Sequence, residues 1–148
     1  MMAPDPFAAA FDAARAAAQA EEVPVGAAIV RAGQIIATAG NRTLRDKDPT
    51  AHAEMLAIRA ACEAIDSERL IDCDLYVTLE PCAMCAAAIS FARIRRLYFS
   101  ADDPKGGAVE HGPRFFSQPT CHHAPDVYGG IRESEAATLL RDFFQSRR

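Results

Sequence analysis

Short hydrophobic runs alternate along this 148-residue chain with segments whose hydrophobic residues recur at helical spacing. Residues 25–30 and 35–39 are two apolar runs, and Gly33 in the short connection between them predicts a β-hairpin. From residue 51 to about residue 65, hydrophobic residues recur every three or four positions, which predicts a helix. The hairpin and this helix are joined by a polar loop of turn-forming residues.

The middle of the chain continues the same alternation. Residues 75–79 and 96–100 are β-rich runs and predict two further strands. Between them, Pro81 suits the first position of a helix, so a helix is predicted over residues 82–92. Residues 102–125 are rich in Gly, Pro and His and lack periodicity, which predicts a segment that is mostly loop.

Helices are also predicted near both ends. An Ala-rich amphipathic helix begins near Pro6, and a short strand is predicted at residues 126–128. Ser134 is placed to cap a final helix that runs to the basic end of the sequence. Strands that alternate with helices predict a layered α/β sheet with helices on its faces, in one domain over residues 1–148.

Composition narrows the class of protein. Hydrophobic residues make up 50% and charged residues 24%, a balance typical of soluble globular proteins. No run of about 18 apolar residues is present, so no transmembrane helix is expected. The first residues read as a helix and not as a signal peptide, so a cytoplasmic chain with five reduced cysteines is expected. The net charge of −4 argues against a general nucleic-acid coat but allows a local basic patch.

The candidate chemistry begins with Cys82 and Cys85 at the start of a predicted helix. Two cysteines at this spacing can both reach one zinc ion, although a redox pair or two core thiols would have the same spacing. His52 begins the other predicted helix, and one His with two Cys matches a catalytic zinc site whose fourth position is open. Cys62 and Cys73 are interpreted as packed hydrophobic residues. Cys121–His123 could form a second metal cluster, although a polar loop is the favoured interpretation.

Glu54 lies two positions after His52. A carboxylate at the open position of a zinc site could move protons between water and a leaving group. Taken alone, Glu54 could equally be an acid favoured at a helix start, worth about 0.3–1 kcal/mol. Its occurrence together with the Cys pair favours the functional interpretation.

The motifs "HAE" and "PCAMC" together match the H-x-E…P-C-x-x-C signature of zinc-dependent nucleobase deaminases. Within these enzymes the chain resembles the bacterial tRNA-specific adenosine deaminases over about residues 22–148. The resemblance rests on "EVPVGAAIV", "GNR", "DPTAHAEM", "RLIDCDLYVTLEPCAMCAAAI", "RIRRLYFSADDPKGGA" and "LLRDFFQSRR". Residues 109–119 differ in sequence from the best-known member of these deaminases, so the resemblance does not specify which tRNA is the substrate.

The resemblance implies a three-layer α/β/α fold with a central mixed sheet of about five strands, like that of cytidine deaminases. It implies one Zn²⁺ per chain held by His52, Cys82 and Cys85, with Glu54 as the catalytic proton shuttle. The implied reaction is hydrolytic deamination of adenosine to inosine at the wobble position of a tRNA anticodon.

The resemblance also implies partners and substrate contacts. The partner is a tRNA anticodon stem-loop, the expected assembly is a homodimer, and no membrane is involved. The substrate-binding residues it implies are Asn41, Ala53, Asp103, Lys105, Arg147 and Arg148, with backbone groups of Glu80 and Pro81 lining the base pocket. From the residues alone, a turn explains Asn41 and Asp103 equally well, and a solvated helix end explains the terminal arginines.

Two other functions remain open at this point. A deaminase of a free base or nucleoside, of the guanine or cytosine type, would use the same zinc motif and Glu54. A zinc-stabilised binding module without catalysis is the second alternative, but Glu54 and the absence of an obvious fourth ligand argue against it.

Overall fold

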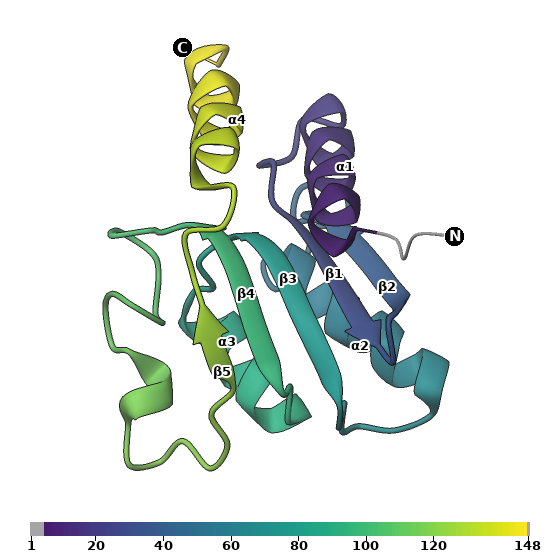
Figure 1. Ribbon diagram of the computed structural model, residues 1–148. Helices are drawn as coiled ribbons and strands as arrows, with labels where there is room; N and C mark the ends of the chain where they lie inside the picture. The colour runs from purple at the N-terminus through teal and green to yellow at the C-terminus, as the bar shows by residue number, and fades with distance from the viewer. Residues whose placement is uncertain (1–4, 148) are drawn as a thin grey trace.

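The computed structural model describes residues 5–147 and consists of a five-stranded sheet covered by helices on both faces (Figure 1). The elements are α1 (Pro6–Gln19), β1 (Gly26–Arg31), β2 (Gln34–Gly40), α2 (Ala53–Ile65), β3 (Cys73–Leu79), α3 (Ala83–Ala92), β4 (Arg96–Ala101), η1 (Phe115–Ser117), β5 (Asp126–Tyr128) and α4 (Glu133–Gln145). Within the described residues, no helix is long and apolar enough to cross a membrane.

The sheet is mixed and has the strand order β2-β1-β3-β4-β5. β1 pairs antiparallel with both β2 and β3, whereas β3, β4 and β5 run parallel to one another. Helices α2 and α3 cover one face, and α1 and α4 cover the other (Figure 1). The predicted three-layer α/β/α fold with five strands is therefore confirmed.

Two glycines explain how the first half of the chain packs. A Cβ atom at Gly26 would lie 1.8 Å from the carbonyl oxygen of Ala10, so only glycine lets α1 approach β1 this closely. Ala32 and Gly33 have φ angles of 51° and 77°, which places both central residues of the hairpin turn in the left-handed region. Such a turn matches the twist of the flanking strands, and the predicted hairpin is confirmed.

Each face of the sheet has its own hydrophobic core. The larger core lies under α2 and α3, and the smaller one packs α1 and α4 against the opposite face. Tyr76, Tyr98 and Tyr128 stack in a row across β3, β4 and β5, with ring centroids 4.5 and 5.0 Å apart. These aromatic contacts tie the short edge strand β5 to the rest of the sheet.

Two predicted helix starts are wrong. Helix α3 begins at Ala83, because Cys82 is extended (φ −73°, ψ 176°) and Pro81 therefore lies outside the helix. The Pro81 carbonyl instead accepts a hydrogen bond from Ala108. Ser134 does not cap α4, since that helix begins one residue earlier, at Glu133.

The start of α4 is stabilised by a different device. The preceding Arg132 is in the left-handed region with a φ of 56°. Its guanidinium donates to both oxygens of Glu135, with each Nη2–O distance 2.9 Å. This pair ties Arg132 to the first turn of α4, where no side chain accepts a hydrogen bond as a cap.

Candidate active site

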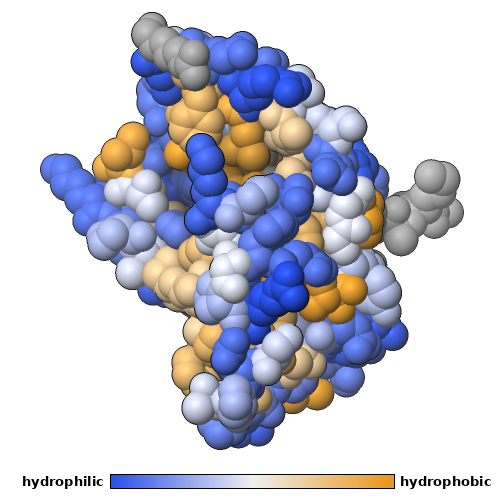
Figure 2. Space-filling model, turned by 90° about the vertical axis from the view of Figure 1, so that its left-hand side faces the viewer, coloured by the Kyte–Doolittle hydropathy of each residue, from blue (hydrophilic) through white to orange (hydrophobic). Residues whose placement is uncertain are grey.

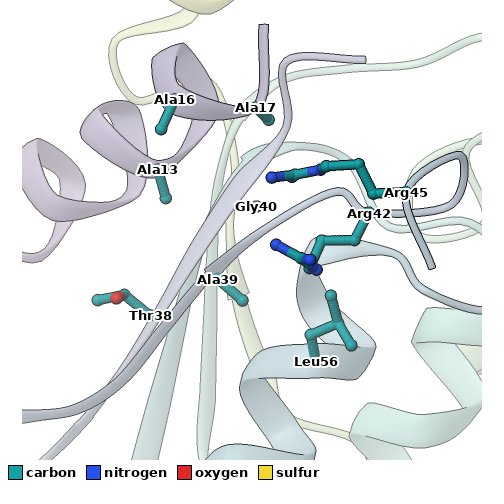
Figure 3. A pocket seen from close by; sticks show the side chains of 9 residues that line it. All are labelled: Ala13, Ala16, Ala17, Thr38, Ala39, Gly40, Arg42, Arg45 and Leu56. Atoms are coloured by element: carbon teal, nitrogen blue, oxygen red, sulfur yellow. The ribbon is translucent and has the colours of Figure 1, made fainter. Parts of the chain in front are cut away.

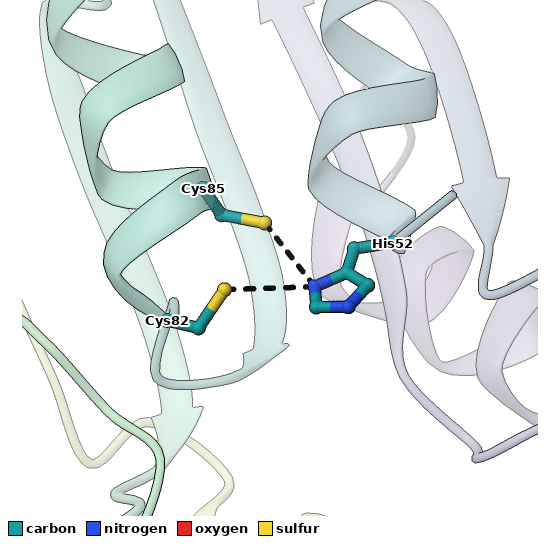
Figure 4. A group of neighbouring side chains, drawn as sticks. All are labelled: His52, Cys82 and Cys85. Atoms are coloured by element: carbon teal, nitrogen blue, oxygen red, sulfur yellow. Dashed lines mark hydrogen bonds between the residues drawn. The ribbon is translucent and has the colours of Figure 1, made fainter. Parts of the chain in front are cut away.

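Three side chains that could hold a metal ion meet where α2 and α3 begin (Figure 4). His52 is the residue before the first turn of α2, and Cys82 holds the same position before α3. Cys85 lies in the first turn of α3 and is fully buried. The His52 Nδ1 atom is 3.6 Å from Cys82 Sγ and 3.5 Å from Cys85 Sγ. The predicted trio is thus brought together, with its ligand atoms all within 4.8 Å of one another.

The donor geometry fits a zinc ion. A tetrahedral zinc about 2.3 Å from sulfur and about 2.0–2.1 Å from nitrogen places those atoms about 3.6 Å apart. Both observed S···N separations match this value. The two sulfurs converge on His52, and all five cysteines are free thiols, which argues against a disulfide pair.

Electrostatics within the trio favour an anionic sulfur. The hydrogen bond from the Cys85 thiol, together with His52, lowers the pKa of Cys82 to about 4. The same contact and burial raise the pKa of Cys85, and the hydrogen bond with Cys82 raises the pKa of His52. The trio therefore holds a thiolate beside a second sulfur and an imidazole, which is the donor chemistry that zinc prefers.

Glu54 lies in the first turn of α2 and is only 4% exposed. Burial raises the pKa of its carboxyl group to about 7, and the negative charge of Cys82 adds to this effect. An extended His52 immediately before the helix lets Glu54 reach the same side as the trio despite the two-residue spacing. A carboxyl group with such a pKa can both accept and release a proton near neutral pH.

His52 and Cys82 of the trio, together with Glu54, line a cavity of about 340 Å³. The residues that line it are Val23, Val25, Asn41, Thr43, His52, Glu54, Leu79, Glu80, Cys82, Asp103 and Gly106. Asn41 Oδ1 accepts a hydrogen bond of 2.8 Å from the Ala53 amide. Asn41 therefore ties the loop after β2 to the start of α2. The Ala53 amide is satisfied by this bond and is not available to a substrate.

A larger cavity of about 400 Å³ lies apart from this chemistry, between α1, β2 and the following loop (Figure 3). Small residues line most of it, and Arg42 and Arg45 point into it. Both arginines are already paired, Arg42 with Asp46 and Arg45 with Glu22. The smaller cavity is the better candidate, since it alone of the two is lined by His52, Cys82 and Glu54.

Sequence reasoning missed the side chain of Glu22, which is fully buried beside the cavity. Its carboxylate accepts backbone hydrogen bonds from Leu44 (3.1 Å) and Arg45 (2.9 Å) and pairs with the Arg45 guanidinium. Arg45 in turn donates to the Asn41 carbonyl. An acid within the apolar stretch "EVPVG" was the available signal, because a buried charge must be paired.

Glu22→Gln is expected to destabilise the fold most near neutral pH. Burial raises the pKa of the Glu22 carboxyl group, but hydrogen bonds from Arg45 and Leu44 outweigh burial and hold this pKa below its ordinary value of 4.5. The ionised form therefore stabilises the fold fully above about pH 4.5. This stabilisation is lost as the pH falls through the folded-state pKa.

Urea unfolding at a series of pH values measures this effect. The difference in free energy of unfolding between wild type and Glu22→Gln should shrink as the pH falls below 4.5. Glu68→Gln, at an exposed position, is the control and should show little difference at any pH. A Glu22→Gln difference that stays constant across the acid range would contradict the assignment.

The predicted RNA-contact residues lie in two places. Asp103 lines the cavity, and its Oδ1 accepts the amides of Lys105 and Gly106, which shapes the loop. Arg147 follows α4, the helix on the face of the sheet opposite α2 and α3. Its guanidinium pairs with Glu21 and stacks 3.7 Å from the Phe143 ring centroid. Arg148 lies outside the described residues.

The remaining cysteines and histidines are not part of the trio. Cys73 is buried and Cys62 is half-buried against the main core, in line with their interpretation as packed residues. Cys121 Sγ contacts the His123 carbonyl at 3.2 Å, and His123 Nε2 lies 2.7 Å from the Ile94 carbonyl. His122 is exposed. These side chains thus have separate partners, and the polar-loop interpretation fits them best.

Comparison with known proteins identifies the family. The model of the cytidine and deoxycytidylate deaminase zinc-binding region matches residues 5–101. A tRNA-specific adenosine deaminase of Agrobacterium fabrum is 67% identical over 135 residues, 91% of this chain and 89% of that protein.

Solved structures agree with this match. One from studies of A-to-I editing by tRNA:A34 deaminases at the wobble position of transfer RNA has a TM-score of 0.90 at 64% identity, covering 91% of this chain and 98% of that one. A guanine deaminase of Bacillus subtilis has a TM-score of 0.65 at 34% identity, with 83% and 82% covered. This chain therefore belongs to the cytidine and deoxycytidylate deaminase family of zinc-binding enzymes.

Proposed function

We propose that this chain is a single zinc-dependent deaminase domain that converts adenosine to inosine at the wobble position of a tRNA anticodon. The main support for this proposal is the buried carboxyl group of Glu54, which lies beside the His52–Cys82–Cys85 trio and lines the same cavity as His52 and Cys82. The choice of tRNA rests on the 67% identity to a tRNA-specific adenosine deaminase and the 64% identity to an A34 deaminase structure.

His52, Cys82 and Cys85 would hold the metal through Nδ1 and the two sulfur atoms. When bound, a zinc ion with an open fourth position supplies a hydroxide nucleophile from water near neutral pH. Glu54 takes the proton that the water loses and delivers it to the ring nitrogen beside C6 of adenine. Once the water oxygen has bonded to C6, Glu54 takes the remaining proton of that oxygen and delivers it to the amino group on C6, so that the C6–N bond breaks and ammonia leaves. The buried surroundings of Glu54 keep bulk water from competing for these protons.

The substrate nucleotide would enter the cavity between two loops. The first loop carries Asn41. Its side-chain oxygen Oδ1 already accepts a hydrogen bond from the Ala53 amide, so its side-chain NH₂ group is the part left to contact the nucleotide. The second loop carries Asp103 and Lys105, which we propose to meet the ribose and phosphates of the anticodon. An anticodon loop suits this site, because its unpaired bases can be turned out of the stack at modest cost.

The end of α4 is the third proposed RNA contact. Helix α4 extends beyond the sheet edge at which β3 and β4 end, the edge that leads to Glu80 and Cys82 (Figure 1). Figure 2 shows the molecule from the left-hand side of Figure 1, with hydrophobic side chains gathered among hydrophilic ones near the C-terminal end. Phe144 of α4 is 53% exposed and could stack on a base. The Glu21–Arg147 pair is exposed and weak, so a phosphate can displace Glu21.

Replacing Arg147 and Arg148 together by alanine is expected to weaken RNA binding and flatten its salt dependence. Each lost phosphate contact should reduce the slope of log K against log salt by about 0.7. Titration of a labelled anticodon stem-loop at several salt concentrations measures this slope. Arg69→Ala, in the connection between α2 and β3, is the control and should keep the wild-type slope. An unchanged slope in the double variant would make both arginines part of a solvated helix end.

Substrate comparison tests the proposed function. Inosine formation and ammonia release would be measured on an anticodon stem-loop with adenosine at the wobble position, and on free adenosine, guanine and cytidine. Zinc would be quantified in the same sample. Turnover of the stem-loop alone is the expected result. Turnover of a free base alone would assign the activity of the guanine deaminase relative instead, and bound zinc without any turnover would indicate a binding module.

We also propose a cytoplasmic homodimer, in line with a tRNA substrate. The outer face of α3 supports this assembly, because the Phe91 side chain is 74% exposed on a helix that is otherwise mostly apolar. Light scattering of the purified chain should then give twice its mass of 16.0 kDa.

A further inference from the structure

Glu80 directly follows the last residue of β3, two residues before Cys82, and its side chain is only 2% exposed. It is one of the residues that line the active-site cavity. The mechanism above gives its carboxylate no role. A buried carboxylate at this place needs partners, and those partners show what it does.

Every partner of the Glu80 carboxylate comes from the segment 103–111, more than twenty residues further along the chain. Oε1 accepts the Asp103 amide at 2.9 Å and lies 2.8 Å from His111 Nδ1. Oε2 accepts the amides of Val109 (3.1 Å), Glu110 (2.8 Å) and His111 (3.1 Å). A carboxylate has about four lone-pair sites, so five donors saturate it. Glu80 therefore has no capacity left to bind substrate itself.

The segment also packs tightly against this carboxylate. A Cβ atom at Gly107 would lie 2.5 Å from Glu80 Cδ and 2.6 Å from the Asp103 carbonyl oxygen. The neighbouring Ala108 amide donates to the Pro81 carbonyl at 2.9 Å. The backbone of 103–111 is thus fastened to residues 80–81 by side-chain and main-chain bonds together.

We propose that Glu80 is a positioning residue that holds the segment 103–111 as one wall of the cavity. Through the Asp103 amide it sets where Asp103 stands, and the Asp103 carboxylate then sets the Lys105 and Gly106 backbone. This inference rests on the proposed function, in which Asp103 and Lys105 meet the anticodon. Loss of the anchor should weaken substrate binding without removing the metal or the proton transfer by Glu54.

Two variants break the anchor in different ways. Glu80→Gln replaces one oxygen by an amide group, which faces backbone N–H groups and cannot accept from them. Gly107→Ala keeps the carboxylate but adds a methyl group where no space exists. Glu110→Gln is the matched control, because its side chain is exposed on the same segment and only its backbone amide contacts Glu80.

Steady-state deamination of the anticodon stem-loop gives the first readout. Both variants should raise KM about ten-fold or more, as expected for lost hydrogen bonds to a charged group. The kcat should stay within about two-fold, with one zinc per chain. Glu110→Gln should match the wild type in both parameters. A fall in kcat at unchanged KM, or loss of zinc in both variants, would overturn the proposal.

Amide hydrogen exchange gives a second readout that needs no substrate. Exchange at Val109–His111 should accelerate in Glu80→Gln and Gly107→Ala but not in Glu110→Gln. Unchanged exchange in both variants would overturn the anchoring role even if the chain edits tRNA. If the wild type deaminates only a free base, the proposed function fails. The exchange rates and the KM for that base would then decide whether Glu80 positions the wall.

Discussion

Replacing Glu54 by alanine is expected to reduce kcat on an anticodon stem-loop by about two to four orders of magnitude, the usual contribution of a general acid–base group. The physical reason is that Glu54 is the buried carboxyl group beside the His52–Cys82–Cys85 trio and is proposed to carry every proton of the reaction. Single-turnover rates of inosine formation measure the effect and separate it from product release.

The variant should still contain one zinc per chain, because Glu54 lies outside the His52–Cys82–Cys85 trio that is proposed to hold the metal. Its fold should be retained, since the change only shortens a side chain at the cavity. Glu63→Ala, near the other end of the same helix, serves as the control for the loss of a carboxyl group. A Glu54→Ala protein that had lost its metal would show that Glu54 is a ligand and not a proton shuttle.

The second large effect is expected from removing any ligand of the trio. His52→Ala, Cys82→Ala and Cys85→Ala should each lose zinc and, with it, all measurable deamination. Zinc binds the folded site and not the unfolded chain, so each variant should also unfold at a lower temperature than the zinc-loaded wild type. Metal content, Tm and turnover would be measured on the same preparations.

Cys62→Ala and Cys121→Ala are the matched controls for this series. Both cysteines are half-buried free thiols outside the trio. Their variants should keep one zinc per chain and wild-type turnover. If Cys121→Ala lost zinc while Cys82→Ala kept it, the ligand set would have to be reassigned.

Local patterns predicted most of this fold. The two apolar runs around Gly33 and the helical spacing after His52 indicated elements that the structure contains, because burial of one face dictates both periods. Helix starts were harder. Pro81 and Ser134 are residues that favour helix starts, but α3 begins after an extended Cys82 and α4 begins after a left-handed Arg132, one or two residues from the predicted starts.

The site divides in the same way. His52, Glu54 and the Cys pair were predictable, because each motif is compact and its chemistry follows from spacing. The partners of Glu22 and Glu80 were not predictable, since they lie more than twenty residues away in loops without periodicity. The pairing of Arg147 with Glu21 likewise joins opposite ends of the chain.

The hydrogen bond from the Ala53 amide to Asn41 Oδ1 joins the loop after β2 to the first turn of α2. The side chain of His52 points toward Cys82 and Cys85 and makes no capping bond. The acceptor for a backbone N–H group in the first turn of α2 therefore comes from Asn41, in the loop after β2. Asn41→Ala would therefore fray the helix that carries Glu54 as well as remove an amide from the cavity. Asn41→Asp keeps the acceptor for Ala53 while it deletes the donor and adds a negative charge, so this variant would test contact with the nucleotide with the start of the helix intact.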